Sequence, residues 1–371
     1  MSIKRKRSVF YSLFIASVII IAYICKGQTL MFSLSGNSQF VRQLLSDGAP
    51  FFYKYNQINT KLVVNSVLGF DINSPLTVIK SNVYAFSAFE QKEVEIPKEE
   101  EEQTVDMTDA KPIKEYTISY KNPKGYYEVQ GVLVHNATTY DFNPKELLDE
   151  PLKFDFNEKG PKVLIVHSHS SESYTPTDKN YYLPTDPDRT EDINYNVVRV
   201  GTEITDTLKS YGIEVVHSTK LHDYPSYNGS YKNSLATVKE YLEKYPSIKI
   251  VLDIHRDAMV QSDGTKLKLV ADVQNKKAAQ IMLLTGSDQG GLDHPHWREN
   301  LKFAIKLQRT VNSMYPGLAR PVSFTKERYN THSTYASIIV EIGTTGNTLE
   351  EALTSARMVG SAVATFIKTN Q

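Results

Sequence analysis

The fold is decided by the stretch Lys162-Val163-Leu164-Ile165-Val166-His167-Ser168-His169-Ser170-Ser171-Glu172-Ser173-Tyr174, in which a short apolar run passes directly into a polar cluster. The apolar residues are mostly β-branched, which predicts a buried strand. Open α/β sheets place their ligand sites where strands end. His169 and Glu172 are three residues apart, so one helical turn would bring their side chains together to hold a divalent metal such as zinc. The alternative is a polar turn whose histidines bond backbone groups.

Two later apolar runs end in polar side chains in the same way. One carries His255 within residues 248–257, and the other carries Glu341 within residues 337–344. Helical patterns alternate with these strands, which predicts an α/β fold with a mostly parallel sheet and helices on both faces. Because parallel strands send their carboxyl ends to one edge, we expect these side chains and those of residues 167–172 to converge.

Two histidines and one carboxylate form the ligand set of hydrolytic zinc sites. We therefore predict that His169, Glu172 and His255 bind Zn²⁺ and that Glu341 is the catalytic base. Glu341 lies among apolar residues, where an unpaired carboxylate is costly, so it needs a partner or a role. The alternative is a salt bridge from Glu341 to an arginine, for which the candidates are Arg256, Arg320 and Arg328.

Further residues are candidates for contacts around the metal. Asp253 shares a strand face with His255 and could orient the imidazole, although an N-cap or a salt bridge explains it equally well. Substrate or supporting contacts are predicted for three others, namely His167, Arg256 and His332. Glu191 is the alternative carboxylate ligand, but a charge that complements a helix N-terminus accounts for it as well.

The composition excludes one broad class of function. The 371 residues contain 42 Lys and Arg and 42 Asp and Glu, which cancel to a formal net charge of zero. This balance argues against a generic polyanion binder, so we expect no nucleic-acid partner. The single cysteine, Cys25, allows neither a disulfide framework nor a thiolate metal site. A metal must therefore be held by histidine and carboxylate side chains.

The amino terminus has the pattern of a membrane anchor. A basic cluster at residues 4–7 precedes an apolar run from Val9 to Cys25, which is near the lower limit for a membrane span. We expect an uncleaved, single-pass signal anchor in the cell membrane, with a cytoplasmic N-terminus and an extracytoplasmic catalytic domain. A cleaved signal peptide and a lipid-modified cysteine are the alternatives, but no A-x-A pattern is present and Ile24 is bulky.

The rest of the chain divides by composition. The run Glu99 to Glu102 lies in a sharply polar region that is typical of a solvated, flexible linker. The predicted parts are a basic stub and transmembrane helix at 1–27, an irregular juxtamembrane region at 28–90, an acidic linker at 91–115, a small β-rich lead-in at 116–160 and a catalytic zinc hydrolase domain at 161–371.

Longer stretches of the catalytic region resemble a known family. The pattern of two histidines and two glutamates is similar to the zinc sites of zinc carboxypeptidases and N-acetylmuramoyl-L-alanine amidases. The stretches that together resemble the stage II sporulation protein P family are 167–174, 221–231, 245–248, Val251-Leu252-Asp253-Ile254-His255-Arg256-Asp257-Ala258, 294–301 and Val340-Glu341-Ile342-Gly343. The His-x-x-Glu step alone would be a weak signal, whereas the stretches taken together are specific.

The resemblance implies a membrane-anchored peptidoglycan hydrolase of endospore-forming bacteria. Such a protein uses zinc to cleave the amide between muramic acid and the stem peptide during forespore engulfment, and it is also credited with cutting peptide cross-links. The resemblance also implies stage II sporulation proteins D and M as partners. Amidases take their carboxylate ligand from a later helix start, so Glu172 and Glu191 remain in competition. A zinc carboxypeptidase acting on cell-wall peptides and a non-catalytic wall-binding scaffold stay open as other functions.

Overall fold

The computed structural model describes residues 109–119, 125–176 and 178–371, all of which belong to one compact unit. The predicted signal anchor, the juxtamembrane region and most of the acidic linker lie outside the described residues. Within the described residues, no helix combines the length and apolar character needed to cross a membrane.

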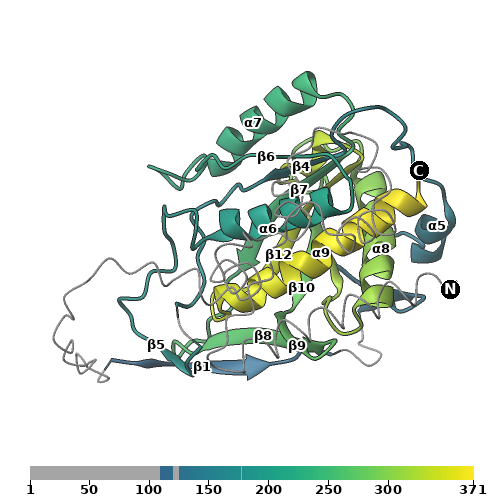
Figure 1. The fold of residues 1–371 in the computed structure, drawn as a ribbon. Helices are drawn as coiled ribbons and strands as arrows, with labels where there is room; N and C mark the ends of the chain where they lie inside the picture. The colour runs from purple at the N-terminus through teal and green to yellow at the C-terminus, as the bar shows by residue number, and fades with distance from the viewer. Residues whose placement is uncertain (1–108, 120–124, 177) are drawn as a thin grey trace, which may run out of the picture. The chain divides into compact units, whose positions relative to one another are not determined.

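A mixed eight-stranded sheet forms the centre of this unit (Figure 1). Its strands, in spatial order, are β2 (Tyr126–Val129), β3 (Val132–Asn136), β11 (Val322–Phe324), β10 (Ile281–Thr285), β12 (Ala336–Thr344), β7 (Ile250–Asp257), β4 (Val163–Val166) and β6 (Val215–His217). Neighbouring strands are parallel except at β2–β3 and β10–β12. The expectation of a mostly parallel sheet is therefore corrected to a mixed one. No helix lies between β7 and β10, so the chain lacks the crossover that a parallel return requires.

A second sheet of four strands was not anticipated. Its strands, in spatial order, are β5 (Tyr181–Tyr182), β1 (Lys111–Tyr116), β8 (Lys266–Val273) and β9 (Lys276–Ala279). β8 and β9 form a hairpin whose turn residues, Gln274 and Asn275, have φ of 53° and 61°. Positive φ at both positions is what a two-residue type I′ turn requires.

The structure places two of the expected domain boundaries differently. β1 begins at Lys111, so the end of the predicted linker at 91–115 is a strand. β2 and β3 belong to the main sheet, and α5 (Pro144–Asp149) packs against α8 (Trp297–Met314). The described part of residues 116–160 therefore lies in the same compact unit as residues 161–371.

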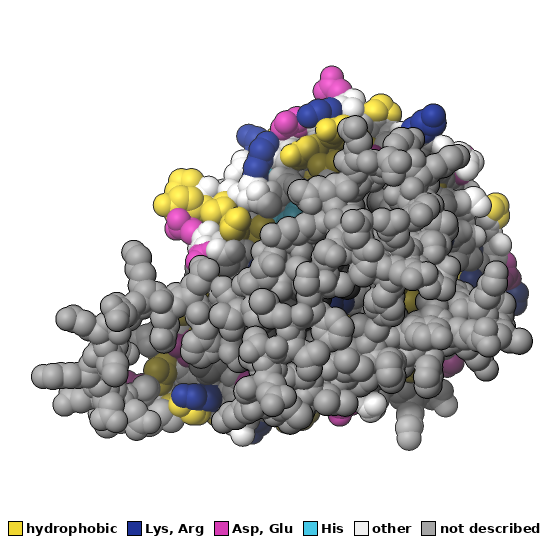
Figure 2. Space-filling view, in the orientation of Figure 1, with side chains coloured by type: hydrophobic (Ala, Val, Ile, Leu, Met, Phe, Trp, Pro, Cys, Tyr) yellow, Lys and Arg dark blue, Asp and Glu magenta, His cyan; other side chains and the backbone are white. Residues whose placement is uncertain are grey.

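Helices cover both faces of the main sheet, as expected. α6 (Val197–Ser210), α8 and α9 (Leu349–Thr369) share one large apolar core with the sheet. α6 and α9 run side by side in front of β7 and β12 (Figure 1). α7 (Ser230–Lys244) packs on the opposite face, where Val238 joins a smaller core with Leu164, Val166 and Val251. The described surface over α7 mixes acidic, basic and apolar side chains (Figure 2).

The side chains of β7 and β12 alternate between the core and the α7 face. Ile250, Leu252 and Ile254 lie in the large core, as do Ile338, Val340 and Ile342. Successive residues of a strand point to opposite faces, so Asp253, His255, Asp257 and Glu341 point to the face that α7 covers. Glu341 lies directly opposite His255 in the strand register. The pairing of two buried strands thus brings together a histidine and a glutamate that are distant in the sequence.

Candidate active site

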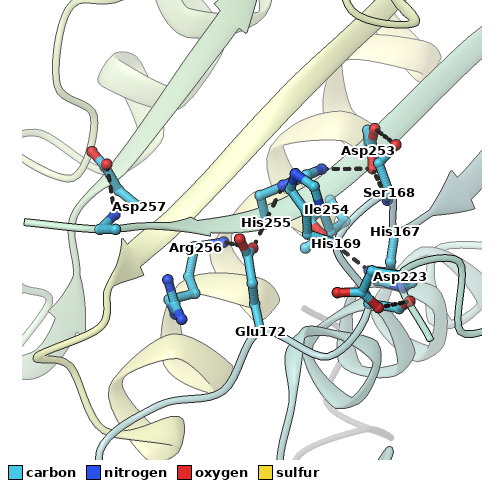
Figure 3. A network of polar contacts seen from close by, with 12 residues as sticks. His167, Ser168, His169, Glu172, Asp223, Asp253, Ile254, His255, Arg256 and Asp257 are labelled. Carbon is cyan, nitrogen blue, oxygen red and sulfur yellow. Dashed lines mark hydrogen bonds and ion pairs between the residues drawn. The ribbon is translucent and has the colours of Figure 1, made fainter. Parts of the chain in front are cut away.

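Glu172 and His255 form the centre of the candidate site. Glu172 lies in the loop after β4, and its Oε2 accepts a hydrogen bond of 3.1 Å from the backbone N–H of Arg256. The same oxygen is 3.5 Å from His255 Nδ1, and Arg189 Nη2 is 3.7 Å from Glu172 Oε1. Figure 3 shows the carboxylate between the Arg256 backbone and the His255 ring. Burial opposes ionisation of Glu172, but the hydrogen bond and charge of His255 lower its pKa, so it is a carboxylate.

His169 lies beside this pair. Its ring centroid is 5.2 Å from that of His255, and it stacks on the ring of Tyr227 at 4.5 Å. Its Nε2 is 3.0 Å from the hydroxyl of Tyr227, whereas its buried Nδ1 has no hydrogen-bond partner among the described residues. Burial and the charge of His255 lower the pKa of His169. A neutral imidazole with a free Nδ1 is the form in which histidine binds a metal.

Asp253 supports His255 from behind. The Oδ1 atom of Asp253 is 3.0 Å from His255 Nε2 and accepts a hydrogen bond of 2.7 Å from the backbone N–H of Ser168. The Ser168 hydroxyl donates a hydrogen bond of 2.5 Å to Oδ2. Burial opposes ionisation of Asp253, but the charge of His255 and these hydrogen bonds lower its pKa. Burial likewise disfavours imidazolium, yet Asp253 and Glu172 raise the pKa of His255. The contact with Asp253 leaves Nδ1 of His255 directed toward Glu172.

Glu341 is a half-buried carboxyl group that forms no salt bridge with any of the described residues. No cation among the described residues lies within salt-bridge distance of it, and its buried Oε2 has no hydrogen-bond partner there. Of the expected alternative partners, Arg320 pairs with Asp257 at 2.8 Å and Arg256 donates to the carbonyl oxygens of Ser173 and Asp188. Burial raises the pKa of Glu341 to about 8, with the charges of Glu172 and Asp257 adding to it and that of His255 opposing. Arg328, the third candidate, donates to the carbonyl oxygen of Asp293, so the salt-bridge alternative finds no partner among the described residues.

The donor set fits a zinc ion. Nitrogen and oxygen ligands lie about 2.0–2.2 Å from tetrahedral zinc, which separates two such ligands by about 3.3–3.6 Å. Glu172 Oε2 and His255 Nδ1 are 3.5 Å apart, and His169 presents its unpartnered Nδ1 next to them. Across the described part of the chain, no three His, Cys, Asp or Glu side chains already form a closed metal-binding group. The structure thus has two donors at ligand spacing and a third nearby.

The other predicted site residues lie elsewhere or act indirectly. His167 is completely buried, and its ring nitrogens contact the carbonyl oxygen of Ile254 and Nε2 of His217, so it cannot touch a substrate from this position. Arg256 fixes the loop that carries Glu172 through its bonds to Ser173 and Asp188. His332 contacts His294, with ring centroids 6.2 Å apart. Glu191 is exposed in the loop before α6, which favours Glu172 as the carboxylate ligand.

Sequence reasoning missed two further residues at the site. Tyr227 was seen only as part of a family-like stretch, yet it contacts His169 by stacking and through its hydroxyl. Arg189 lies over the Tyr227 ring at 4.6 Å and pairs with the buried Asp223 at 2.8 Å. A tyrosine-rich stretch at residues 224–231, which runs into the start of α7, was the available signal, but nothing local in the sequence connects it to His169.

Comparisons with known proteins point to one family. The family model described as stage II sporulation protein P matches residues 42–364. A protein named stage II sporulation protein P, from Bacillus subtilis (strain 168), is 31% identical over 201 residues, which cover 51% of this chain and 47% of that protein. The matched part of this chain thus spans about half the length of that relative.

Solved structures of amidases cover a similar share of the chain. The N-acetylmuramoyl-L-alanine amidase AmiC2 of Nostoc punctiforme is 14% identical, with 57% of this chain and 98% of that chain covered and a TM-score of 0.33. The CwlD amidase from Clostridioides difficile, solved in complex with the GerS lipoprotein, is 17% identical, with 56% and 98% covered and a TM-score of 0.32. These low TM-scores leave the site assignment to rest on the chain's own residues.

Proposed function

The chain belongs to the stage II sporulation protein P family, and on that premise we propose that it is a peptidoglycan hydrolase that cleaves the N-acetylmuramoyl-L-alanine amide during forespore engulfment. The observation that carries the proposal is the pairing of Glu341 with His255 across adjacent strands, next to Glu172 and His169. This arrangement combines a metal-ligand set with a carboxyl group that is free to move a proton.

In this proposal His169, Glu172 and His255 hold zinc, which when bound polarises the amide carbonyl and activates water. Glu341 takes the proton from the attacking water and delivers it to the amide nitrogen as the bond to the peptide breaks. Its pKa of about 8 lies near neutral pH, where one group can both accept and donate a proton. Asp253 holds the His255 ring in place for this site.

The cellular setting belongs to the same proposal. Residues 9–25 would anchor the chain in the cell membrane, with the N-terminus in the cytoplasm and the catalytic unit outside. Peptidoglycan would then be the partner of the site, and the stage II sporulation proteins D and M would be the protein partners during engulfment. Cleavage of peptide cross-links is a further activity that the same site could support, because both bonds are amides.

The test is a muropeptide digestion by the full chain, followed by mass analysis. We expect wild type to release stem peptides and to leave a free lactyl carboxyl on muramic acid, and we expect Glu341→Gln, His255→Ala and chelation each to abolish this. Arg309→Gln, an exposed arginine on α8, is the matched control and should retain activity. Loss of single C-terminal amino acids instead would indicate a zinc carboxypeptidase. Unchanged muropeptides would indicate a wall-binding scaffold and would refute the amidase.

A further inference from the structure

Arg320 reaches across the site face of β12. Its backbone N–H bonds the carbonyl of Ile281 at the start of β10, and its Nη1 donates to Asp257 Oδ2 at the end of β7, at 2.8 Å. β12 lies between β10 and β7, and the β12 residue that points to this face is Glu341, which pairs with His255. Arg320 therefore links the start of β10 to the end of β7, and the residue it reaches, Asp257, lies two residues after His255.

Two of the three nitrogens of this guanidinium have no partner. Arg320 is only 6% exposed, and its Nε and Nη2 are buried without a hydrogen-bond acceptor among the described residues. Buried, unpaired donors of a charged group are costly, so an acceptor is expected at this position. Nε and Nη2 lie along one edge of the guanidinium plane and form the fork that binds a carboxylate through two parallel hydrogen bonds.

Asp257 sets the direction of that fork. It occupies Nη1 with one oxygen, while its other oxygen accepts from the backbone N–H of Ala258 at 2.8 Å. The surrounding acidic groups on this face are Glu172, Asp257 and Glu341, and of these only Asp257 lies within salt-bridge distance of Arg320. The arginine is thus held in one orientation, and the donors of its second edge stay unpaired among the described residues.

The position of the fork relative to the site indicates which anion it suits. Asp257, which binds Arg320, is two residues beyond His255 on the same strand face (Figure 3), so the Cα atoms of Asp257 and His255 are about 7 Å apart. Amide cleavage releases the nitrogen of the first stem-peptide residue. A carboxylate on the second residue lies about two extended residue steps, or about 7 Å, from the broken bond. In muramoyl peptides with an amidated lactyl group, the glycan carries no carboxylate, so the anion must come from the peptide.

We infer that Arg320 binds, through Nε and Nη2, the α-carboxylate of the second residue of the stem peptide. The inference rests on the proposed amidase function and adds a determinant of substrate choice to it. Arg320 is a substrate-binding residue in this account. Stem peptides in which this carboxylate is converted to an amide lose both the charge and one acceptor oxygen, and they should be poorer substrates.

The test compares two muramoyl dipeptides, one ending in isoglutamate and the other in isoglutamine, with the full chain as enzyme. We expect wild type to favour the carboxylate substrate by about 10- to 100-fold in kcat/KM, mainly through KM, as the loss of one charge-assisted pair predicts. Arg320→Gln should lower the rate on the carboxylate substrate to that on the amide and leave the amide rate within about threefold. Arg320→Lys, which keeps the charge without the fork, should restore part of the preference.

Three outcomes would decide against the inference. Equal kcat/KM for the two substrates with wild type would overturn it while leaving the amidase proposal intact. A preference that persists in Arg320→Gln would place carboxylate recognition elsewhere. Cleavage of neither dipeptide, combined with unchanged intact muropeptides, would refute the amidase proposal and the inference with it. If Arg320→Gln does not fold, the wild-type preference and its reduction in Arg320→Lys decide the matter, with Arg309→Gln as the unchanged control.

Discussion

Replacing Glu341 with glutamine should make the folded chain more stable and the enzyme nearly inactive. The carboxyl group ionises near pH 4.5 in the unfolded chain, but burial raises its pKa to about 8 in the fold. Above pH 4.5, unfolding therefore releases a proton that the folded chain holds, and stability falls by about 1.4 kcal/mol per pH unit. At pH 7 this amounts to at most about 3 kcal/mol, which Glu341→Gln should recover. The substitution should recover nothing at pH 4, where both states are protonated.

The assay is urea unfolding of the chelated full chain at pH 4 and pH 7, with muropeptide hydrolysis measured in parallel. Loss of the proton carrier should reduce kcat by about 10²- to 10⁴-fold. The control is Glu351→Gln, because Glu351 is a buried glutamate that pairs with Lys268 at 2.8 Å and caps α9. Its loss should destabilise the fold by about 1–3 kcal/mol and leave activity unchanged. A Glu341→Gln variant that is less stable at pH 7 would show that Glu341 has a structural partner and would refute the reasoning.

Other perturbations follow from the same contacts. Asp253→Asn should weaken zinc binding by about 10- to 100-fold, measured by competition with a chelator. The reason is that the carboxylate 3.0 Å from His255 Nε2 becomes a neutral amide. Burial lowers the pKa of His217 to about 4. As the pH falls below 6.5, His217 is protonated first in the unfolded chain, so the free energy of unfolding drops by up to about 2 kcal/mol by pH 5. His217→Gln should reduce this dependence of the unfolding free energy on pH, measured by urea unfolding. Gly201→Ala should lower stability by about 1–3 kcal/mol despite its helical position, because its Cβ would lie 2.6 Å from the ring of His167.

Each of these has a result that would count against it. Unchanged zinc affinity in Asp253→Asn would mean that the 3.0 Å contact does not orient His255. An equally steep acid slope in His217→Gln would assign the loss of stability to other groups. A Gly201→Ala protein as stable as wild type would show that the histidine pair can move away, and that His167 does not depend on close packing against α6.

The strands of the candidate site were predictable because their signals are local. Apolar, β-branched runs that end in His169, His255 and Glu341 can be recognised within a few residues of sequence, and the structure confirms β4, β7 and β12 at these positions. The end of α6 is local in the same way, because Gly212, with φ of 77°, adopts a conformation after the helix that glycine reaches without strain. Convergence at one edge then followed from the expected parallel pairing.

The remaining features depend on contacts between distant residues. The antiparallel direction of β10 depends on the β8–β9 hairpin, for which no local pattern had been recognised. β1 pairs with β8 across a long stretch of chain, so it was taken for part of a linker. The placement of Tyr227 on His169 and of Arg320 against Asp257 follows from loop paths that no short window of sequence encodes.

The most direct measurement of the central claim is the zinc content of the purified full chain after exhaustive dialysis against a metal-free buffer. The account predicts one tightly bound zinc per chain in wild type and in Glu341→Gln, and loss of that zinc in His169→Ala, Glu172→Gln and His255→Ala. Wild-type chain that cleaves muropeptides without bound zinc, or ligand variants that keep the metal, would contradict it.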